Sequence, residues 1–294
     1  MRNRNKNTVK IIASSTPNLL DEALRLAETA SVATATVEAE YGDVLVPGSW
    51  ATLAHHGPRA HLPCPCILPN RQDAPDTLLV GISHLDLDTL GGVLSLLGTK
   101  PEAEDFWELA AKVDVQGPHM VPIITRDQNL VSKLNAFWAW SDAHRLSLPP
   151  GQIVDATANI EEARLALLAI LEGDNALLEA GKVWASRKAE LAASTLRGVR
   201  GPVAFRVSEV FVNHLYTPEQ TAIVGYNPTK GIITASFVDE VTHGDANVAN
   251  ILKAYFGPEA GGRKTVGGGP RDLFITEQEA EKFWAYMAQQ VMGN

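Results

Sequence analysis

The chain has 294 residues, of which 45% are hydrophobic and 20% charged, as in a globular protein with room for two domains. Its formal net charge of −9 argues against broad binding of long nucleic acids, which needs a basic surface. No hydrophobic run approaches the roughly 18 residues of a membrane span, and no signal-peptide core follows the basic N-terminus. We therefore expect a cytoplasmic protein that does not interact with a membrane.

The first half of the chain alternates predicted strands with predicted helices. This alternation predicts an α/β fold, with an N-terminal domain over residues 1–150 built on a mostly parallel sheet flanked by helices. Strands are expected at Val9 to Ala13, Ser31 to Glu40, Asp43 to Leu53, Thr77 to Ile82 and Val121 to Thr125. Helices are expected from Pro17, from about Leu90, at Pro101 to Lys112 and at Gln128 to His144.

A change of composition at Pro149-Pro150-Gly151 precedes two helices rich in alanine and leucine, which predict a helical linker over residues 151–200. The first helix is expected from a cap at Asn159 to Leu171, with Gly173 after its end, and the second from Asp174 to Leu196, stopped by Gly198.

The remaining residues, 201–294, predict a smaller C-terminal α/β domain. Its expected strands are Pro202 to Phe211, Thr221 to Tyr226 and Gly231 to Val238, followed by a helix at Asn247 to Tyr255 and a glycine-rich loop at Gly257 to Arg271. Thr276 and Glu279 have the spacing of a capping box and predict a last helix from Glu277 to Val291.

The first chemical motif is His84, Asp86 and Asp88, directly after the predicted strand Thr77 to Ile82. On an extended backbone these three side chains point the same way, at the strand end where open α/β sheets bind ligands. A ligand set of nitrogen and oxygen atoms is typical of a harder first-row ion such as Mn²⁺, and less so of a zinc site, which often uses thiolates. The alternative is an acidic turn in which Asp88 or Thr89 caps the next helix.

Two further groups of candidate residues lie in the same half. His55 and His56 are adjacent, so on a strand they point to opposite faces, and one could reach a metal while the other meets the substrate. The alternative is a solvated pair in a turn. Asp114 and His119 flank a Gly-Pro turn and can converge on one ion, or they can be a helix cap and a surface residue.

Cys64 and Cys66 are the only cysteines, and one proline separates them. They match neither a disulfide framework nor a zinc-binding CxxC pair, and we interpret them as two small apolar residues in a turn.

The glycine-rich segment predicts an anion-binding site, because glycine lets backbone amides approach a phosphate and the neighbouring cations supply positive charge. It has five glycines within nine residues. The alternative is a flexible loop without a ligand. The candidate residues are Gly262, Arg263, Lys264, Gly267, Gly268, Gly269 and Arg271.

Together these features resemble the DHH phosphoesterase superfamily over roughly residues 76–125 and 201–294. The family's first motif, a strand ending in His-x-Asp-x-Asp, is matched by His84, Asp86 and Asp88. Its C-terminal substrate-binding domain is matched in order and spacing by Thr221 to Tyr226, Gly231 to Ser236 and Asn247 to Gly269.

The chain also departs from the family pattern at two places. The family's Asp-His-His motif normally follows the first motif, whereas Ala54-His55-His56 precedes it and lacks the aspartate. The histidine of the family's glycine loop is absent, and Pro270-Arg271 follows Gly269. These departures favour an altered substrate or a loss of activity.

The resemblance implies a phosphoesterase that uses two Mn²⁺ or Mg²⁺ ions on a small nucleotide, a short oligonucleotide or polyphosphate, and it leaves a homodimer open. The implied metal ligands are His56, His84, Asp86, Asp88 and Asp114, and the implied catalytic residues are His55, His56 and His119. The implied substrate-binding residues are Gly262, Arg263, Gly267, Gly268, Gly269 and Arg271. The alternative is a non-catalytic nucleotide- or phosphate-binding regulator on the same scaffold.

Overall fold

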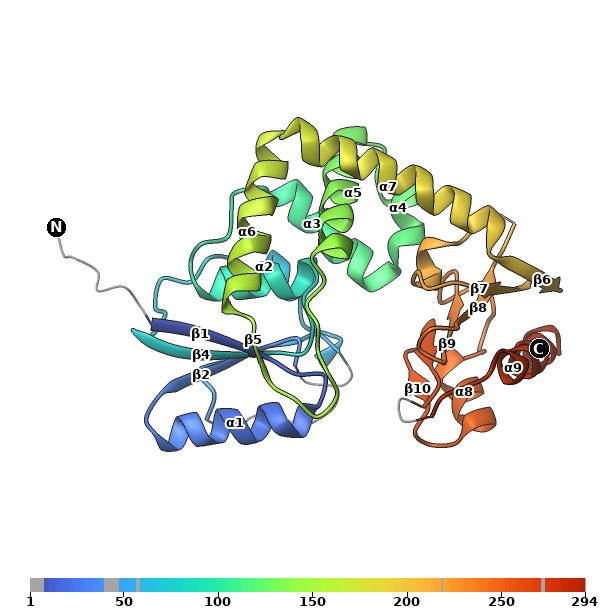
Figure 1. Cartoon of the computed structure of the whole chain (residues 1–294), viewed down its shortest axis with the longest axis horizontal. Coiled ribbons are helices and arrows are strands. Elements are labelled where there is room, and N and C mark those ends of the chain that lie inside the picture. Colours follow the sequence, from blue (N-terminus) through green and yellow to red (C-terminus); the bar gives the residue numbers. More distant parts are fainter. Residues whose placement is uncertain (1–7, 40–47, 57–58, 218, 271–272, 294) are drawn as a thin grey trace. The chain divides into compact units, whose positions relative to one another are not determined.

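The structure, a computed structural model, describes residues 8–39, 48–56, 59–217, 219–270 and 273–293. The chain divides into a first unit, residues 1–115 with 127–184, and a second unit, residues 116–126 with 185–294. Each unit combines a sheet with helices, so the predicted α/β class is confirmed (Figure 1). Within the described residues, no helix is both long and apolar enough to cross a membrane.

The sheet of the first unit has five strands in the order β3-β2-β4-β1-β5, and only β5 runs antiparallel to its neighbour. Helix α1 packs on one face and helices α2 and α6 lie on the other (Figure 1). Covered on both faces, β4 buries Leu78, Val80 and Ile82 almost completely. The predicted mostly parallel sheet flanked by helices is therefore confirmed.

The first unit contains these elements in chain order: β1 (Thr8–Ala13), α1 (Pro17–Thr29), β2 (Ala33–Val37), β3 (Ala51–Leu53), the 3₁₀ helix η2 (Pro65–Ile67), β4 (Thr77–Ile82), α2 (Leu87–Leu96), α3 (Glu104–Gln116), α5 (Gln128–Ala143), β5 (Val154–Asp155), α6 (Thr157–Glu172) and α7 (Asn175–Ser194). The last residue of α3 and the last turns of α7 belong to the second unit.

Two predictions about helix limits are wrong in the helical region. Helix α6 begins before Asn159, because the Asp155 carboxylate accepts a hydrogen bond from the Thr157 amide at 3.0 Å and starts the helix there. Gly173 ends α6 in the left-handed conformation, as predicted. Helix α7 ends at Ser194 rather than at Leu196, because residues 196–200 pair with the neighbouring strand β7 (Val203–Val207) instead.

The second unit has a six-stranded sheet in the order β10-β11-β9-β8-β7-β6, in which only β7 and β8 are parallel neighbours. Helices α8 and α9 pack on it around a core that includes Phe205, Phe237 and Phe283. Its elements are η3 (Pro118–Met120), α4 (Val121–Ile124), β6 (Leu196–Arg200), β7 (Val203–Val207), η4 (Val212–His214), β8 (Ala222–Asn227), β9 (Ile232–Phe237), α8 (Val248–Phe256), β10 (Gly261–Gly262), β11 (Val266–Gly268) and α9 (Glu277–Met292).

Two predictions for this unit are wrong and one is confirmed. Residues 121–124 form the short helix α4 instead of a strand, and Pro122 lies in its first turn, where proline is tolerated. A short apolar run of this kind does not distinguish strand from helix. The glycine-rich segment is no simple loop, because β10 and β11 form a hairpin within it. The capping box of Thr276 and Glu279 at the start of α9 is present.

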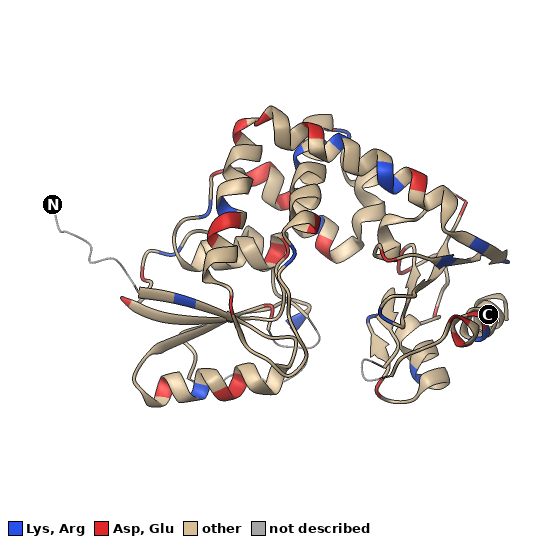
Figure 2. Ribbon diagram, in the orientation of Figure 1, with Lys and Arg blue, Asp and Glu red and all other residues tan. Residues whose placement is uncertain are grey.

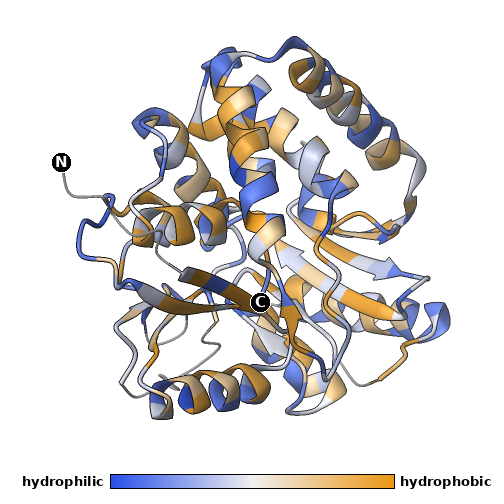
Figure 3. Cartoon of the chain, turned by 60° about the vertical axis from the view of Figure 1, so that its left-hand side comes forward, coloured by the Kyte–Doolittle hydropathy of each residue, from blue (hydrophilic) through white to orange (hydrophobic). Residues whose placement is uncertain are grey.

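Hydropathy and charge are distributed as these packing arrangements require. Both the strands and the helices carry hydrophilic as well as hydrophobic residues (Figure 3). Acidic and basic residues are interspersed along α1, where Asp21 and Arg25 form an ion pair with 2.8 Å between Oδ2 and Nε (Figure 2).

The glycine pair Gly91 and Gly92 allows helix α2 to contact the segment Cys64–Cys66 without side chains between them. A Cβ atom on Gly91 would lie 2.5 Å from the Cβ of Cys66 and 2.7 Å from its Cα, too close for any real contact. A Cβ atom on Gly92 would lie 2.6 Å from the Cβ of Pro65. This close approach fixes where Cys64–Cys66 lies on the first unit.

We expect Gly91→Ala to lower the free energy of unfolding by about 1–3 kcal/mol, because the methyl group must displace backbone rather than a flexible side chain. Urea denaturation followed by tryptophan fluorescence measures this. Gly268→Ala is the matched control, since the nearest atom lies 3.5 Å from its added Cβ and we expect little change. Equal stability of both variants would contradict the close packing of Cys64–Cys66 on α2.

Candidate metal centre

Acidic and histidine side chains gather where three neighbouring parallel strands of the first unit end. Glu38 follows β2 directly, and His55 follows β3 by two residues. Asp88 lies in the first turn of α2, the helix that follows β4. Because β3, β2 and β4 are adjacent and parallel, their carboxyl ends meet at one edge of the sheet, where open α/β folds place ligand sites.

Glu38 is held at this edge by both neighbouring strands. Its amide donates to Leu53 O at 2.8 Å, and its carbonyl accepts from the Ser83 hydroxyl. Its carboxylate is buried, accepts from the His55 amide at 3.2 Å and forms an ion pair with His56 Nε2. Glu38 has a φ of 49°, which is uncommon for a residue other than glycine, and such conformations cluster at functional sites.

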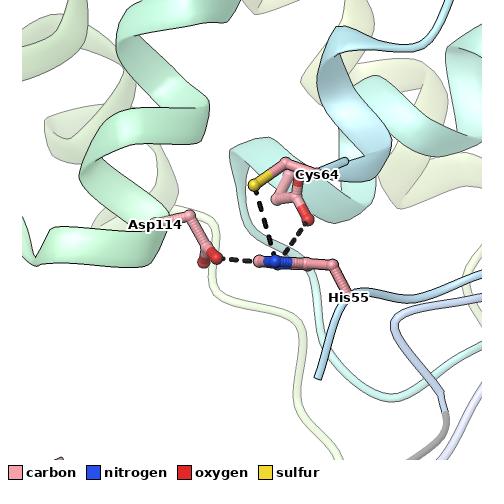
Figure 4. Close-up of side chains that lie close together, drawn as sticks. His55, Cys64 and Asp114 are labelled. Atoms are coloured by element: carbon pink, nitrogen blue, oxygen red, sulfur yellow. Dashed lines mark hydrogen bonds and ion pairs between the residues drawn. The ribbon is translucent and has the colours of Figure 1, made fainter. Parts of the chain in front are cut away.

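His55 is the centre of the cluster. Its Nε2 lies 2.9 Å from Asp114 Oδ2 on helix α3, 3.4 Å from Asp88 Oδ2 and 3.9 Å from Glu38 Oε1. On the other side of the ring, Nδ1 lies 3.5 Å from Cys64 Sγ. Figure 4 shows the imidazole between the Cys64 sulfur and the Asp114 carboxylate.

These residues form two overlapping groups whose ligand atoms lie within 4.8 Å of one another. One group is His55, Cys64, Asp88 and Asp114, and the other is Glu38, His55 and His56. Both contain His55, whose Nε2 can bind one ion only, so a second ion would be held by Glu38 and His56. Carboxylate and imidazole donors in this number suit a first-row ion such as Mn²⁺.

The buried polar atoms of the cluster fit a divalent cation. Within the described part of the chain, the buried atoms Asp88 Oδ2 and Asp114 Oδ2 both face one nitrogen, His55 Nε2, at 3.4 and 2.9 Å, and none of the three makes a hydrogen bond of good geometry. Buried carboxylates that share a single nitrogen are costly and call for a further partner, such as an ion that binds them. Asp88 Oδ1, by contrast, accepts from the Cys66 amide at 2.9 Å, which fixes the carboxylate with Oδ2 toward His55.

The protonation of His55 shows the same need for positive charge. Burial alone would lower its pKa, but Asp114, Asp88 and Cys64 outweigh burial and raise the pKa to about 12. The carboxylates around His55 thus favour a positive charge at this place. A divalent cation among the same oxygen atoms would supply that charge.

His84 and Asp86 do not join these two groups. His84 Nε2 lies 3.0 Å from Asp86 Oδ2, and both side chains are 41% exposed. Burial would lower the pKa of His84, but Asp86 raises it to about 9. Asp86 also caps helix α2 by accepting from the Thr89 amide at 2.8 Å.

The expected common direction of His84, Asp86 and Asp88 is wrong, because β4 ends at Ile82 and Asp88 is already helical. Asp86, and neither Asp88 nor Thr89, is the cap of α2. The structure places Asp88 and Asp114, two of the predicted ligands, next to His55. His56, also a predicted ligand, forms an ion pair with the neighbouring Glu38. A ligand role for His84 and Asp86 stays a prediction.

His119 belongs to the second unit, whereas its predicted partner Asp114 belongs to the first. Its ring donates from Nε2 to Val238 O at 2.7 Å and lies 4.4 Å from the ring of Tyr216, centroid to centroid. Burial lowers the pKa of His119. The structure thus gives His119 a packing role in the second unit, and its catalytic role stays a prediction.

The glycines of the predicted phosphate-binding segment have a structural role in the β10–β11 hairpin. A Cβ atom on Gly262 would lie 2.3 Å from Val266 O, and one on Gly267 would lie 2.5 Å from Gly261 O. The Gly269 amide donates to Ile233 O at 3.1 Å. Anion binding by Gly262, Arg263, Gly267, Gly268 and Gly269 stays a prediction, and Arg271 lies outside the described residues.

Sequence reasoning missed Glu38 and Cys64. Glu38 lies near the end of the predicted strand Ser31 to Glu40, after small and β-branched residues, so an acidic residue near a strand end was the available signal. Cys64 gave no such signal, because the sequence does not show that Cys64 packs against His55.

No known family model matches the chain, and no curated protein matches its sequence. Among solved structures, a pGpG-specific phosphodiesterase, PggH from Vibrio cholerae, is similar with a TM-score of 0.42 and 10% identity, over 97% of this chain and 99% of that one. An exopolyphosphatase-related protein from Bacteroides fragilis gives a TM-score of 0.33 and 11% identity, over 94% and 96% of the two chains. An uncharacterized protein from Helicobacter pylori G27 gives a TM-score of 0.25 and 13% identity, over 76% of this chain and 77% of that one. These TM-scores are low, and we base the function on the residues of the site.

Proposed function

We propose that this chain is a divalent-metal-dependent phosphoesterase of the DHH type. The observation that carries the proposal is the buried cluster of Glu38, His55, Asp88 and Asp114, in which three carboxylates face the single nitrogen His55 Nε2. The resemblance of residues 76–125 and 201–294 to that superfamily supports phosphoester hydrolysis as the reaction. The substrate class is a small nucleotide, a short oligonucleotide or polyphosphate.

In this proposal, His55 Nε2, Asp88 and Asp114 hold one Mn²⁺ or Mg²⁺ ion, and Glu38 and His56 beside them hold a second. Such ions stabilise charge on phosphoryl oxygens and lower the pKa of water, which are the two needs of phosphoester hydrolysis. The protein's own contribution is rigidity. Glu38 is fixed by backbone hydrogen bonds to Leu53 and Ser83, and Asp88 by the Cys66 amide.

Of the two histidines His56 is the more exposed, so we assign contact with the substrate to the ion that His56 and Glu38 hold. The β10–β11 hairpin of the second unit, with Arg263 and Arg271, is our candidate for binding the substrate phosphate that does not react. Cytoplasmic location and a homodimer stay predictions.

Metal analysis and a hydrolysis screen test the proposed function together. Purified protein is assayed for bound Mn²⁺ and then for Mn²⁺-dependent cleavage of linear and cyclic dinucleotides, short oligonucleotides and polyphosphate. We expect hydrolysis of at least one class, lost on chelation and restored by Mn²⁺. Metal and nucleotide binding without hydrolysis would instead support the alternative, a non-catalytic regulator, and no metal binding would refute both the centre and the enzyme.

A further inference from the structure

The segment Cys64–Cys66 contacts two residues of the metal centre at once. Cys64 Sγ lies 3.5 Å from His55 Nδ1, and the Cys66 amide donates to Asp88 Oδ1 at 2.9 Å. The segment is packed against helix α2 at Gly91 and Gly92, where no Cβ atom fits. It is therefore held rigidly enough to orient both ligands.

The two nitrogens of the His55 ring have different surroundings. Nε2 faces the carboxylates of Asp114, Asp88 and Glu38, so a metal shared with them must bind at Nε2. A neutral histidine binds a metal through the nitrogen that carries no proton, and the other nitrogen keeps the proton. That other nitrogen, Nδ1, needs a hydrogen-bond acceptor, and Cys64 Sγ is the atom beside it.

We propose that Cys64 is a positioning residue, which accepts a hydrogen bond from His55 Nδ1 and so fixes Nε2 as the atom presented to the metal. This inference rests on the metal centre of the proposed function. The partners that orient metal-binding histidines are usually carboxylates, carbonyls or water, so a thiol is a distinct choice.

The surroundings of the thiol agree with an acceptor that keeps its own proton. Cys64 Sγ lies 3.7 Å from Ala111 O, to which the S–H group points as a donor. The Cys64 side chain is buried, with one imidazole nitrogen and one carbonyl oxygen beside its Sγ. A neutral thiol is a weak acceptor and a poor metal ligand, as the positioning role requires.

The test measures metal binding rather than activity. Isothermal titration with Mn²⁺ compares the wild-type protein with Cys64→Ala and Cys64→Ser. We expect Cys64→Ala to weaken Mn²⁺ binding by about 10–100-fold, the usual loss when such a partner is removed. Cys64→Ser should restore most of the affinity, because a hydroxyl both accepts and donates.

Ser95→Ala is the matched control for loss of a buried group. The Ser95 hydroxyl is buried on helix α2 and donates to Pro69 O at 2.6 Å, away from the two ligand groups. We expect it to lose stability while keeping the wild-type affinity for Mn²⁺. Thermal unfolding of all variants confirms that each one folds.

The absorption spectrum of Co²⁺-loaded wild-type protein gives a second readout that needs no variant. We expect no thiolate-to-metal charge-transfer band in the near ultraviolet. Such a band would make Cys64 a direct ligand and overturn the positioning role, as would wild-type affinity in Cys64→Ala or no recovery in Cys64→Ser. Wild-type protein that binds no Mn²⁺ overturns the inference together with the metal centre. Binding with the expected variant effects but no hydrolysis refutes only the enzymatic function.

Discussion

Asp88→Asn is expected to weaken Mn²⁺ binding and Mn²⁺-dependent hydrolysis by at least about 100-fold, because loss of a direct ligand exceeds the 10–100-fold cost of losing an outer partner. Asparagine keeps the size of the side chain and an oxygen that can accept from the Cys66 amide. What it removes is the negative charge of Oδ2, 3.4 Å from His55 Nε2. The expected loss therefore reports on metal binding and not on packing.

Asp86→Asn is the comparison that separates the two aspartates. Asparagine caps helices as well as aspartate does, so α2 keeps its hydrogen bond from the Thr89 amide. Because Asp86 pairs with His84 and lies outside both ligand groups, we expect a much smaller loss of metal affinity than for Asp88→Asn.

Titration calorimetry with Mn²⁺ and initial rates of hydrolysis measure both variants, and circular dichroism checks their folding. Equal losses in the two variants would support the sequence-based prediction that Asp86 is a ligand too. Wild-type binding in Asp88→Asn would refute the candidate centre.

The fold was predictable wherever a local pattern determined the element. The apolar run Thr77 to Ile82 became strand β4 with the predicted bounds, and the capping box of Thr276 and Glu279 starts helix α9. Elements whose form depends on tertiary pairing were not predictable in this way. Leu196 was predicted to end a helix but begins strand β6, which pairs with β7, and the glycine-rich segment reads as a loop but forms a hairpin.

The candidate site was predictable in its residue types and only partly in its geometry. Asp88, Asp114, His55 and His56 were named from motifs, and the structure brings all four to the same sheet edge. Strand alternation wrongly predicted that His84, Asp86 and Asp88 point the same way, because helix α2 begins directly after its cap, Asp86. Glu38 and Cys64 come from segments far from His84 in the sequence, so only the strand order β3-β2-β4 and the packing on α2 place them.

Mn²⁺ is also expected to stabilise the folded protein, by about 4.1 kcal/mol at a free concentration of 1,000 times the Kd. An ion that binds only the folded state shifts the unfolding equilibrium by mass action. For a unit of about 150–250 residues, a stabilisation of this size corresponds to a rise in Tm of roughly 8–16 °C. Differential scanning calorimetry with and without Mn²⁺ measures the rise, and chelation should reverse it. Asp88→Asn should show almost none of it.

The location of the effect is as informative as its size. The two ligand groups lie entirely within the first unit, so hydrogen exchange should slow in β2, β4 and α2 when Mn²⁺ binds. Helices α8 and α9 of the second unit hold no ligand, and we expect their exchange to stay unchanged. Protection confined to α8 and α9 would mean that the ion binds elsewhere and would refute the centre.

This stabilisation depends on metal binding alone, whatever the chain does with a substrate. A phosphoesterase and a non-catalytic regulator would both show it, because both keep Glu38, His55, Asp88 and Asp114. Stabilisation lost in Asp88→Asn therefore establishes the centre first, and the hydrolysis screen then decides between the two functions. Hydrolysis without metal-dependent stabilisation would show the reverse, namely that the activity comes from residues outside this cluster.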